Sequence, residues 1–257
     1  MASRQRGFVS SCWELLRKFY ILIFGDPKSK IIINGKIINL PLSHQLPIYL
    51  NRHPEYDKLI GRLSVFLRNE SRPLIFIDVG ANVGDTIAQF DPKQNDLVIA
   101  IEPNEKFGMY LEMNYGKKEN IKIIKSACSS SIDLINLAFD EKKGTASLIR
   151  ADKSASMSTV TIDLITNQFH NIKNVAIIKI DTDGFDFEVI KGAKSTIKNN
   201  SPAILFECDV FKNQNYIDDI TITLDLLYSC GYTEFLVYDN YGFLVGKYLI
   251  SEKFGNG

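Results

Sequence analysis

The 257-residue sequence has few of the residues that build metal clusters or disulfide frameworks. Its four cysteines are scattered without a CxxC pair, and its three histidines do not lie at ligand spacing from one another. This usage is typical of a reducing compartment, and it excludes a small disulfide scaffold or a zinc cluster of known spacing.

The sequence also lacks an excess of one charge and a long apolar run. Thirty basic residues balance thirty acidic ones, so we predict no nucleic-acid partner. The longest uninterrupted apolar run of the N-terminal segment, residues 19–24, is far shorter than the roughly 20 residues that cross a membrane. A small-residue cleavage site of a signal peptide is absent as well. We therefore expect a cytoplasmic protein.

The N-terminal segment nevertheless carries an apolar helical stripe, formed by Phe8, Cys12, Leu15, Phe19 and Ile23. Two interpretations stay open. The helix docks on its own domain or on a sister subunit, so that residues 1–25 form a homodimer contact. Alternatively, it is a peripheral membrane helix, supported by the nearby cations Arg4, Arg6, Arg17 and Lys18.

What is present in abundance is alternation between strands and helices. A hairpin over residues 30–41 turns at Asn34-Gly35, and a helix follows over 54–69. We then expect strands over 74–78, 96–102, 120–128, 175–181 and 202–209, and helices that include 105–115, 187–199 and 221–231. Short strand-like pieces interrupt this order over 129–162, and a hairpin around Asn240-Tyr241 ends the chain. The pattern predicts an α/β domain over 70–257 with a mostly parallel sheet, preceded by a 1–69 extension for substrate, membrane or assembly contacts.

Polar groups gather where the predicted strands end, which is where open α/β sheets bind ligands. The segment "DVGANVGDT" (78–86) supplies Gly80 and Gly84, which permit a tight turn close to a ligand, and Asn82, which can hydrogen-bond. Glu102 ends the next strand, where a carboxylate can accept both hydroxyls of a ribose. These features favour a nucleoside ligand.

The glycine spacing argues against a dinucleotide. The dinucleotide fingerprint is GxGxxG, whereas here Gly80 and Gly84 are separated by three residues and Asn82 occupies the place of the second glycine. An acidic strand end, Asp78, suits a cationic ligand better than a phosphate. S-adenosylmethionine (SAM) combines a ribose, an ammonium and a positive sulfonium.

Three segments, "IDVGANVGDT", "IEPNEKF" and "IIKIDTDGFDFEVIKGA", resemble in order and spacing the FkbM family of SAM-dependent methyltransferases. The resemblance covers roughly residues 70–210, and "VTIDLI" (160–165) extends it. The usual Asp-x-Glu-Gly of the family stands here as Asp181-Thr182-Asp183-Gly184. The resemblance implies a class I, Rossmann-like sheet of seven strands with a terminal antiparallel hairpin.

The resemblance also implies an activity: O-methylation of a saccharide or glycolipid precursor. Another hydroxylated small metabolite as acceptor, or a SAM-fold protein that only binds, are the alternatives. The expected cofactor-binding residues are Asp78, Gly80, Asn82, Gly84, Glu102, Pro103 and Ala127.

The expected catalytic residues lie at the fourth strand end and over the site. Asp181 is the candidate base that takes a proton from the acceptor hydroxyl, and Asp183 either supports it or caps the following helix. His44 is a weaker candidate base. Asp186 and Glu188 fall in the first turn of that helix, where negative charge suits the dipole. In a metal-assisted variant, Asp181 and Asp209 would share a divalent cation.

Overall fold

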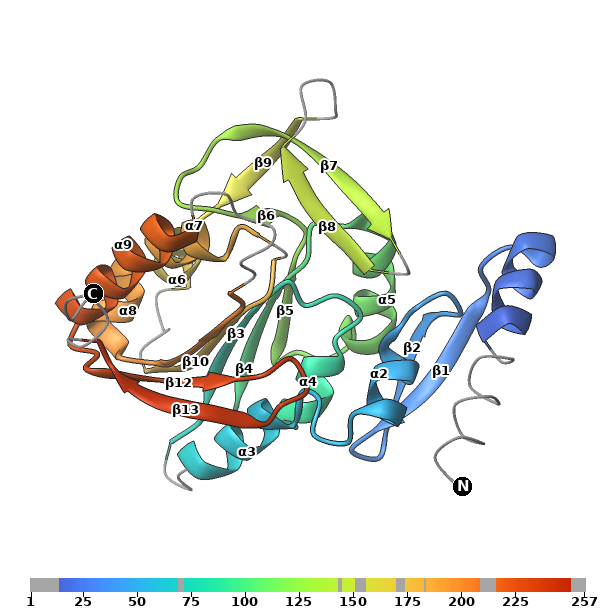
Figure 1. Ribbon diagram of the computed structural model, residues 1–257, viewed down its shortest axis with the longest axis horizontal. Helices are drawn as coiled ribbons and strands as arrows, with labels where there is room; N and C mark the ends of the chain where they lie inside the picture. Colours follow the sequence, from blue (N-terminus) through green and yellow to red (C-terminus); the bar gives the residue numbers. More distant parts are fainter. Residues whose placement is uncertain are drawn as a thin grey trace.

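The computed structural model describes residues 14–68, 72–142, 145–150, 156–169, 174–182, 184–208 and 216–250 (Figure 1). Its centre is a sheet of five parallel strands in the order β11-β10-β3-β4-β5. The strands are β3 (Ile75–Val79), β4 (Leu97–Ile101), β5 (Ile121–Ile124), β10 (Val175–Ile180) and β11 (Ala203–Phe206). The predicted mostly parallel α/β sheet is confirmed.

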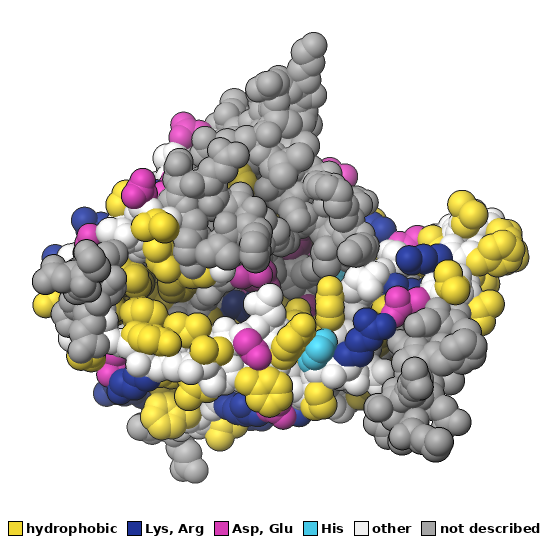
Figure 2. Space-filling view, in the orientation of Figure 1, with side chains coloured by type: hydrophobic (Ala, Val, Ile, Leu, Met, Phe, Trp, Pro, Cys, Tyr) yellow, Lys and Arg dark blue, Asp and Glu magenta, His cyan; other side chains and the backbone are white. Residues whose placement is uncertain are grey.

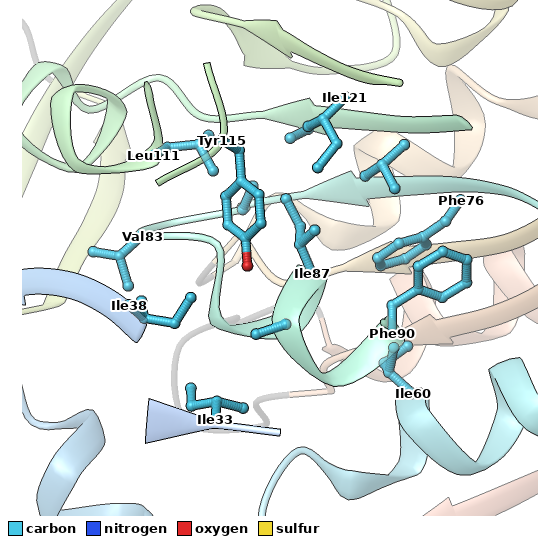
Figure 3. Packing of buried hydrophobic residues seen from close by; sticks show 14 of the residues in the cluster. Ile33, Ile38, Ile60, Phe76, Val83, Ile87, Phe90, Leu111, Tyr115 and Ile121 are labelled. Carbon is cyan, nitrogen blue, oxygen red and sulfur yellow. The ribbon is translucent and has the colours of Figure 1, made fainter. Parts of the chain in front are cut away.

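Both faces of this sheet are buried because alternate side chains of each strand point to opposite faces. Phe76 belongs to one apolar cluster and Ile77 to the other. The first cluster packs under α4 (Asp85–Phe90) and α5 (Glu105–Tyr115), and Figure 3 shows Phe76 and Phe90 meeting there. The second lies under α6 (Ile162–Gln168), α7 (Asp186–Lys191), α8 (Lys194–Asn200) and α9 (Tyr216–Ser229).

The N-terminal segment shares the first of these clusters. A helix over residues 14–24 is followed by β1 (Lys28–Ile33), β2 (Lys36–Pro41), α2 (Leu46–Arg52) and α3 (Lys58–Leu67). The β1–β2 hairpin turns at Asn34 and Gly35, both with positive φ, as the sequence predicts. Ile33, Ile38 and Ile60 belong to the same cluster as the buried side chains of α4 and α5, which cover the sheet (Figure 3). The boundary at residue 69 therefore does not divide the hydrophobic core.

The prediction of seven strands is wrong, because the central sheet has five. Strands β12 (Glu234–Tyr238) and β13 (Leu244–Leu249) pair only with each other among the described residues. The tip of this hairpin packs instead on the turn before α3. There the Tyr241 and His53 rings stack with centroids 3.9 Å apart, and a Cβ on Gly242 would lie 2.4 Å from the Glu55 carbonyl oxygen. Strand periodicity alone cannot distinguish these two placements.

The interrupted segment forms a second, four-stranded sheet in the order β6-β9-β7-β8. Its strands are β6 (Ala127–Cys128), β7 (Leu134–Lys142), β8 (Thr145–Arg150) and β9 (Ser156–Val160). In Figure 1 it stands beside the central sheet, between β5 and α6 in the chain.

The single helix expected over 187–199 is also wrong, since α7 and α8 are separate. A Cβ on Gly192 would lie 2.1 Å from the Ser129 carbonyl oxygen. This close approach of two backbones ends α7 and lets the chain change direction.

Candidate active site

The chain order of the sheet places the site between β3 and β10. The chain runs from β3 outward to β4 and β5, then returns to β10 on the other side of β3. Such a reversal opens a crevice at the carboxyl ends of the two strands. Figure 2 shows this side of the molecule hollowed near its centre, with charged side chains of both signs visible inside.

The glycines of the first loop are required by protein neighbours. Gly80 has φ +78°, and a Cβ there would lie 1.9 Å from the Asp181 carbonyl oxygen. The Asp181 backbone N–H donates to the Val79 carbonyl at 3.0 Å, so the two strand ends meet at Gly80. Gly84, with φ +86°, packs against the ring of Tyr115. Direct contact of either glycine with a ligand stays a prediction.

Asp78 is a buried carboxylate at the end of β3. Its side chain is 0% exposed, and neither oxygen has a hydrogen-bond partner among the described residues. Burial raises the pKa of Asp78 to about 6, although the Lys179 ammonium, 3.6 Å from Oδ1, opposes that rise. Two buried oxygens without partners indicate that donors from a ligand are expected here.

Lys179 is the residue that the sequence reasoning missed. It lies inside β10, is 9% exposed, and its Nζ is 3.1 Å from Asp181 Oδ2. Burial lowers the pKa of Lys179, but the surrounding carboxylates, Asp181 and Asp78 first, raise it well above its usual value. The segment "IIKID" (177–181) could have indicated this role, because a lysine in a strand of buried isoleucines needs an anionic partner.

Two further carboxylates of the site also went unnoticed in the sequence. Asp57 precedes α3 in a left-handed conformation, and Asp85 begins α4; both are partly buried. Burial, followed by repulsion from Asp85, raises the pKa of Asp57 to about 8. The pKa of Asp85 is raised, chiefly by burial. Lys179 thus interacts with four carboxyl groups, those of Asp57, Asp78, Asp85 and Asp181, so acidic groups outnumber ammonium groups in this cluster of described residues.

His44 is buried beside the first loop and forms two hydrogen bonds. Its Nδ1 accepts the Leu46 backbone N–H at 3.1 Å, so the ring proton is assigned to Nε2, which donates to Asn82 Oδ1 at 3.0 Å. Burial lowers the pKa of His44. A neutral ring with both nitrogens occupied is better suited to positioning Asn82 than to taking a substrate proton.

Glu102 holds the same loop from the end of β4. Its Oε2 accepts the Asn82 backbone N–H at 2.7 Å, and its Oε1 accepts that of Asn104 at 2.8 Å. Burial raises the pKa of Glu102 to about 7, although these two hydrogen bonds oppose that rise. Each oxygen keeps a lone pair for a ligand hydroxyl. Pro103 is half-buried directly after it, and Ala127 is buried in β6.

The carboxylates that follow β10 divide into two kinds. The Asp181 side chain is 47% exposed at the crevice. Asp186 is buried: it accepts the Thr182 hydroxyl at 2.8 Å and the Glu207 backbone N–H at 3.2 Å, and burial raises its pKa. Glu188 pairs with Lys191 at 2.6 Å. Asp186 and Glu188 therefore stabilise the turn and the first turn of α7.

Two predicted site residues, Asp183 and Asp209, lie outside the described residues. Their roles stay predictions, as does the pairing of Asp209 with Asp181 around a cation. Within the described part of the chain, no three His, Cys, Asp or Glu side chains are grouped so as to hold a metal.

A parallel sheet with carboxylates at its strand reversal places the protein among the α/β folds that bind ligands at the carboxyl ends of their strands. Residues 78–234 match the family described as Methyltransferase FkbM domain. This segment makes up more than half of the chain, so the protein belongs to that family and is a methyltransferase. The predicted family and enzyme class are confirmed.

Solved structures include several similar methyltransferases. The methyltransferase FkbM of Methylobacillus flagellatus is 17% identical, with a TM-score of 0.45, and the match covers 70% of this chain and 45% of that one. The precorrin-6y C5,15-methyltransferase of Geobacter metallireducens is 13% identical, with a TM-score of 0.39, and the match covers 70% and 72%. Aeropyrum pernix fibrillarin, solved with bound SAM, is 10% identical, with a TM-score of 0.40 and coverage of 85% and 79%. No curated protein matches the sequence. The family assignment rests on the domain match.

Proposed function

We propose that this methyltransferase uses SAM to methylate a hydroxyl of a saccharide or glycolipid precursor, and that it works in the cytoplasm. The observation that supports an oxygen acceptor is the Lys179–Asp181 pair. Lys179 holds Asp181 Oδ2 at 3.1 Å, while Oδ1 has no hydrogen-bond partner among the described residues and lies on an exposed side chain. A hydroxyl is a poor nucleophile, so an oriented carboxylate within reach assists its reaction.

The residues of the crevice fit SAM as the methyl donor. Asp78 offers two buried oxygens without hydrogen-bond partners among the described residues, and these suit an ammonium group. Glu102 retains acceptor capacity for two ribose hydroxyls. Acidic side chains around Lys179 suit a cationic ligand better than a phosphate, because a nearby positive charge favours their ionised forms. When bound, SAM supplies a methyl group on a sulfonium, which is a good leaving group.

The residues of the chain then have separate tasks. Asp181 receives the proton of the acceptor hydroxyl on Oδ1, and Lys179 fixes the orientation of that carboxylate. His44 and Glu102 together hold Asn82, and with it the loop after β3. Most of the rate gain would come from aligning the acceptor oxygen with the methyl group, since alignment removes much of the entropic barrier.

The test supplies the purified protein with SAM and a panel of acceptors. The panel contains nucleotide sugars, lipid-linked saccharides and hydroxylated metabolites without a sugar, and products are assigned by mass spectrometry and NMR. We expect an O-methyl group on a sugar. Methylation confined to nitrogen, carbon or a sugar-free acceptor would contradict the proposed substrate class. Comparison of surface glycans with and without the protein identifies the natural product.

A further inference from the structure

The helix over residues 14–24 presents apolar side chains to solvent. Phe19 is 61% exposed and Leu22 is 81% exposed. The exposed apolar residues of the helix are Leu15, Leu16, Phe19, Tyr20, Leu22, Ile23 and Phe24. At 100° per residue they cover an arc of roughly 200° of its circumference. Figure 2 shows yellow side chains gathered on this helix, at the upper right of the molecule.

The polar side of the same helix faces the protein. Arg17 is only 6% exposed, and its Nη1 donates to the backbone carbonyls of His44 at 3.0 Å and Leu42 at 3.3 Å. Glu14 pairs with Arg52 at 2.5 Å. An ordinary surface helix does the reverse, burying its apolar stripe and exposing its polar face. Polar contacts therefore set the orientation of this helix. Its apolar side faces solvent and is available to bind an apolar partner.

The β1–β2 hairpin follows this helix in the chain and carries exposed apolar and basic side chains of its own. Ile32 and Ile37 face each other across the hairpin, and both are exposed. Lys28 and Lys30 alternate with the less exposed Ser29 and Ile31 along β1 and share the exposed face with Ile32. The carboxylate of Asp26 is already held by Lys106 and Ser43.

Lysine side chains without ion pairs accompany the exposed apolar residues of the helix and the hairpin. Among the described residues, Lys18, Lys28 and Lys30 form no ion pair with a described partner, and all three are exposed. The sequence before the helix adds Arg4 and Arg6 and contains no carboxylate before Glu14.

We propose that the helix over 14–24 and the β1–β2 hairpin dock on an anionic lipid surface. The apolar arc is wider than the stripe by which two helices pair in a dimer, and cations at the border of an apolar helix face attract anionic headgroups. The helix is about 16 Å long, so it lies in the interface. None of the described helices has the length and apolar content needed to cross a bilayer.

The docking surface is connected to the candidate active site. Arg17 binds the backbone of His44, whose ring binds Asn82 in the loop after β3. His44 thus joins the lipid-facing helix to the loop after β3 through one hydrogen bond on each side. This inference does not depend on the acceptor proposed above, because it rests on the helix and hairpin alone.

The test measures co-sedimentation of the full-length protein with vesicles. One set contains phosphatidylcholine with phosphatidylglycerol, and the other contains phosphatidylcholine alone. We expect binding to the anionic set and weaker binding at high salt, since salt screens surface charge. Phe19→Glu/Ile23→Glu should abolish it. Lys28→Gln/Lys30→Gln should reduce it about 25-fold, at about five-fold for each basic residue near the surface.

Matched controls come from other surfaces. Val65→Glu/Phe66→Glu changes two exposed apolar residues of α3, and Lys194→Gln/Lys198→Gln removes two exposed lysines of α8. Both should bind vesicles as the wild type does. All variants should melt within a few degrees of the wild type, and SAM binding should be unchanged. Wild-type protein that ignores anionic vesicles would overturn the proposal. So would a lipid-free dimer that Phe19→Glu/Ile23→Glu converts to monomer, which would assign the surface to a second copy of the chain.

Discussion

The Lys179 ammonium lies 3.1 Å from Asp181 and 3.6 Å from Asp78, so one buried cation joins an exposed carboxylate to a fully buried one. Asp78 lies in β3, and Asp181 directly follows the adjacent strand β10. Lys179 therefore both neutralises the interior end of the crevice and fixes the carboxylate at its mouth.

Replacing Lys179 should destabilise the protein strongly. Lys179→Met leaves Asp78 buried without its cation, and breaking a buried pair in this way costs roughly 3–5 kcal/mol in the free energy of unfolding. Urea denaturation at pH 7 measures the loss. Lys191→Met is the control, because Lys191 pairs with Glu188 at the surface and such pairs contribute up to about 1 kcal/mol. Equal losses in the two variants would contradict the structural role given to Lys179.

Asp181→Asn should separate chemistry from SAM binding. The carboxylate lies at the mouth of the crevice, so SAM affinity should stay within a few-fold while methyl transfer slows by about 10²–10⁴ if Asp181 is the base. Asp91→Asn, at an exposed residue that directly follows the end of α4, should alter neither. Full activity in Asp181→Asn would remove the residue from the mechanism.

Chelation distinguishes the two chemical roles considered for Asp181. Wild-type activity that is lost with EDTA and restored by Mg²⁺ would identify a metal ligand. Activity that is insensitive to EDTA would favour the base.

Glu102→Ala should weaken binding of both SAM and its demethylated product. The substitution removes hydrogen bonds to two backbone N–H groups as well as the expected ribose contacts, and each bond to a charged group contributes roughly 1.5–3 kcal/mol. Isothermal titration calorimetry measures the change. Glu105→Ala, an exposed position in the first turn of α5, is the control. Binding of NAD by the wild type without binding of SAM would refute the assigned ligand.

The free energy of unfolding should fall as the pH rises from 5 to 8. The pKa values of Asp78, Glu102 and Asp57 are raised to about 6, 7 and 8, so the folded protein keeps protons that the unfolded chain releases near pH 4. Their stabilising contribution is complete below the unfolded pKa values and is lost progressively up to the folded ones. Asp57→Asn should flatten this slope in urea titrations at several pH values. A slope that is unchanged would show that Asp57 titrates normally.

Gly80→Ala should cost more stability than Gly35→Ala. Both glycines have positive φ, near +78° and +73°, so each substitution incurs the left-handed cost of about 1–2 kcal/mol. Only at Gly80 does the new Cβ meet backbone, the Asp181 carbonyl oxygen, whereas Gly35 faces open space. Overpacking adds about 1–3 kcal/mol. Thermal melts of the two variants give the difference directly, and equal melts would show that the strand ends can separate.

The local sequence pattern was sufficient to predict those elements whose structure depends mainly on their own residues. The Asn34-Gly35 hairpin, α5 over Glu105–Tyr115 and the strand ends at Asp78 and Glu102 all follow from turn chemistry, periodicity and chain order. The pattern did not predict features that depend on contact between backbone segments far apart in the sequence. Gly192 lies against the backbone of Ser129, and the tip of the β12–β13 hairpin packs on His53 and Glu55.

The site shows the same division between local and distant signals. Asp181 was recognisable because it ends a strand. Asp57 was not, because its place in the site is set by packing of the N-terminal segment on the sheet. Lys179 could have been found by asking which anion would accompany a cation inside a buried strand.

The stack of Tyr241 on His53 joins the β12–β13 hairpin to the segment that precedes Asp57 and α3. The segment that matches the family, residues 78–234, contains neither partner of this contact, nor His44 or Asp57. A fragment trimmed to that segment would lose one of the four carboxylates of the crevice and the ring that holds Asn82. The crevice therefore includes His44 and Asp57 from outside the family-matching segment, and the C-terminal hairpin packs on the turn that leads to Asp57.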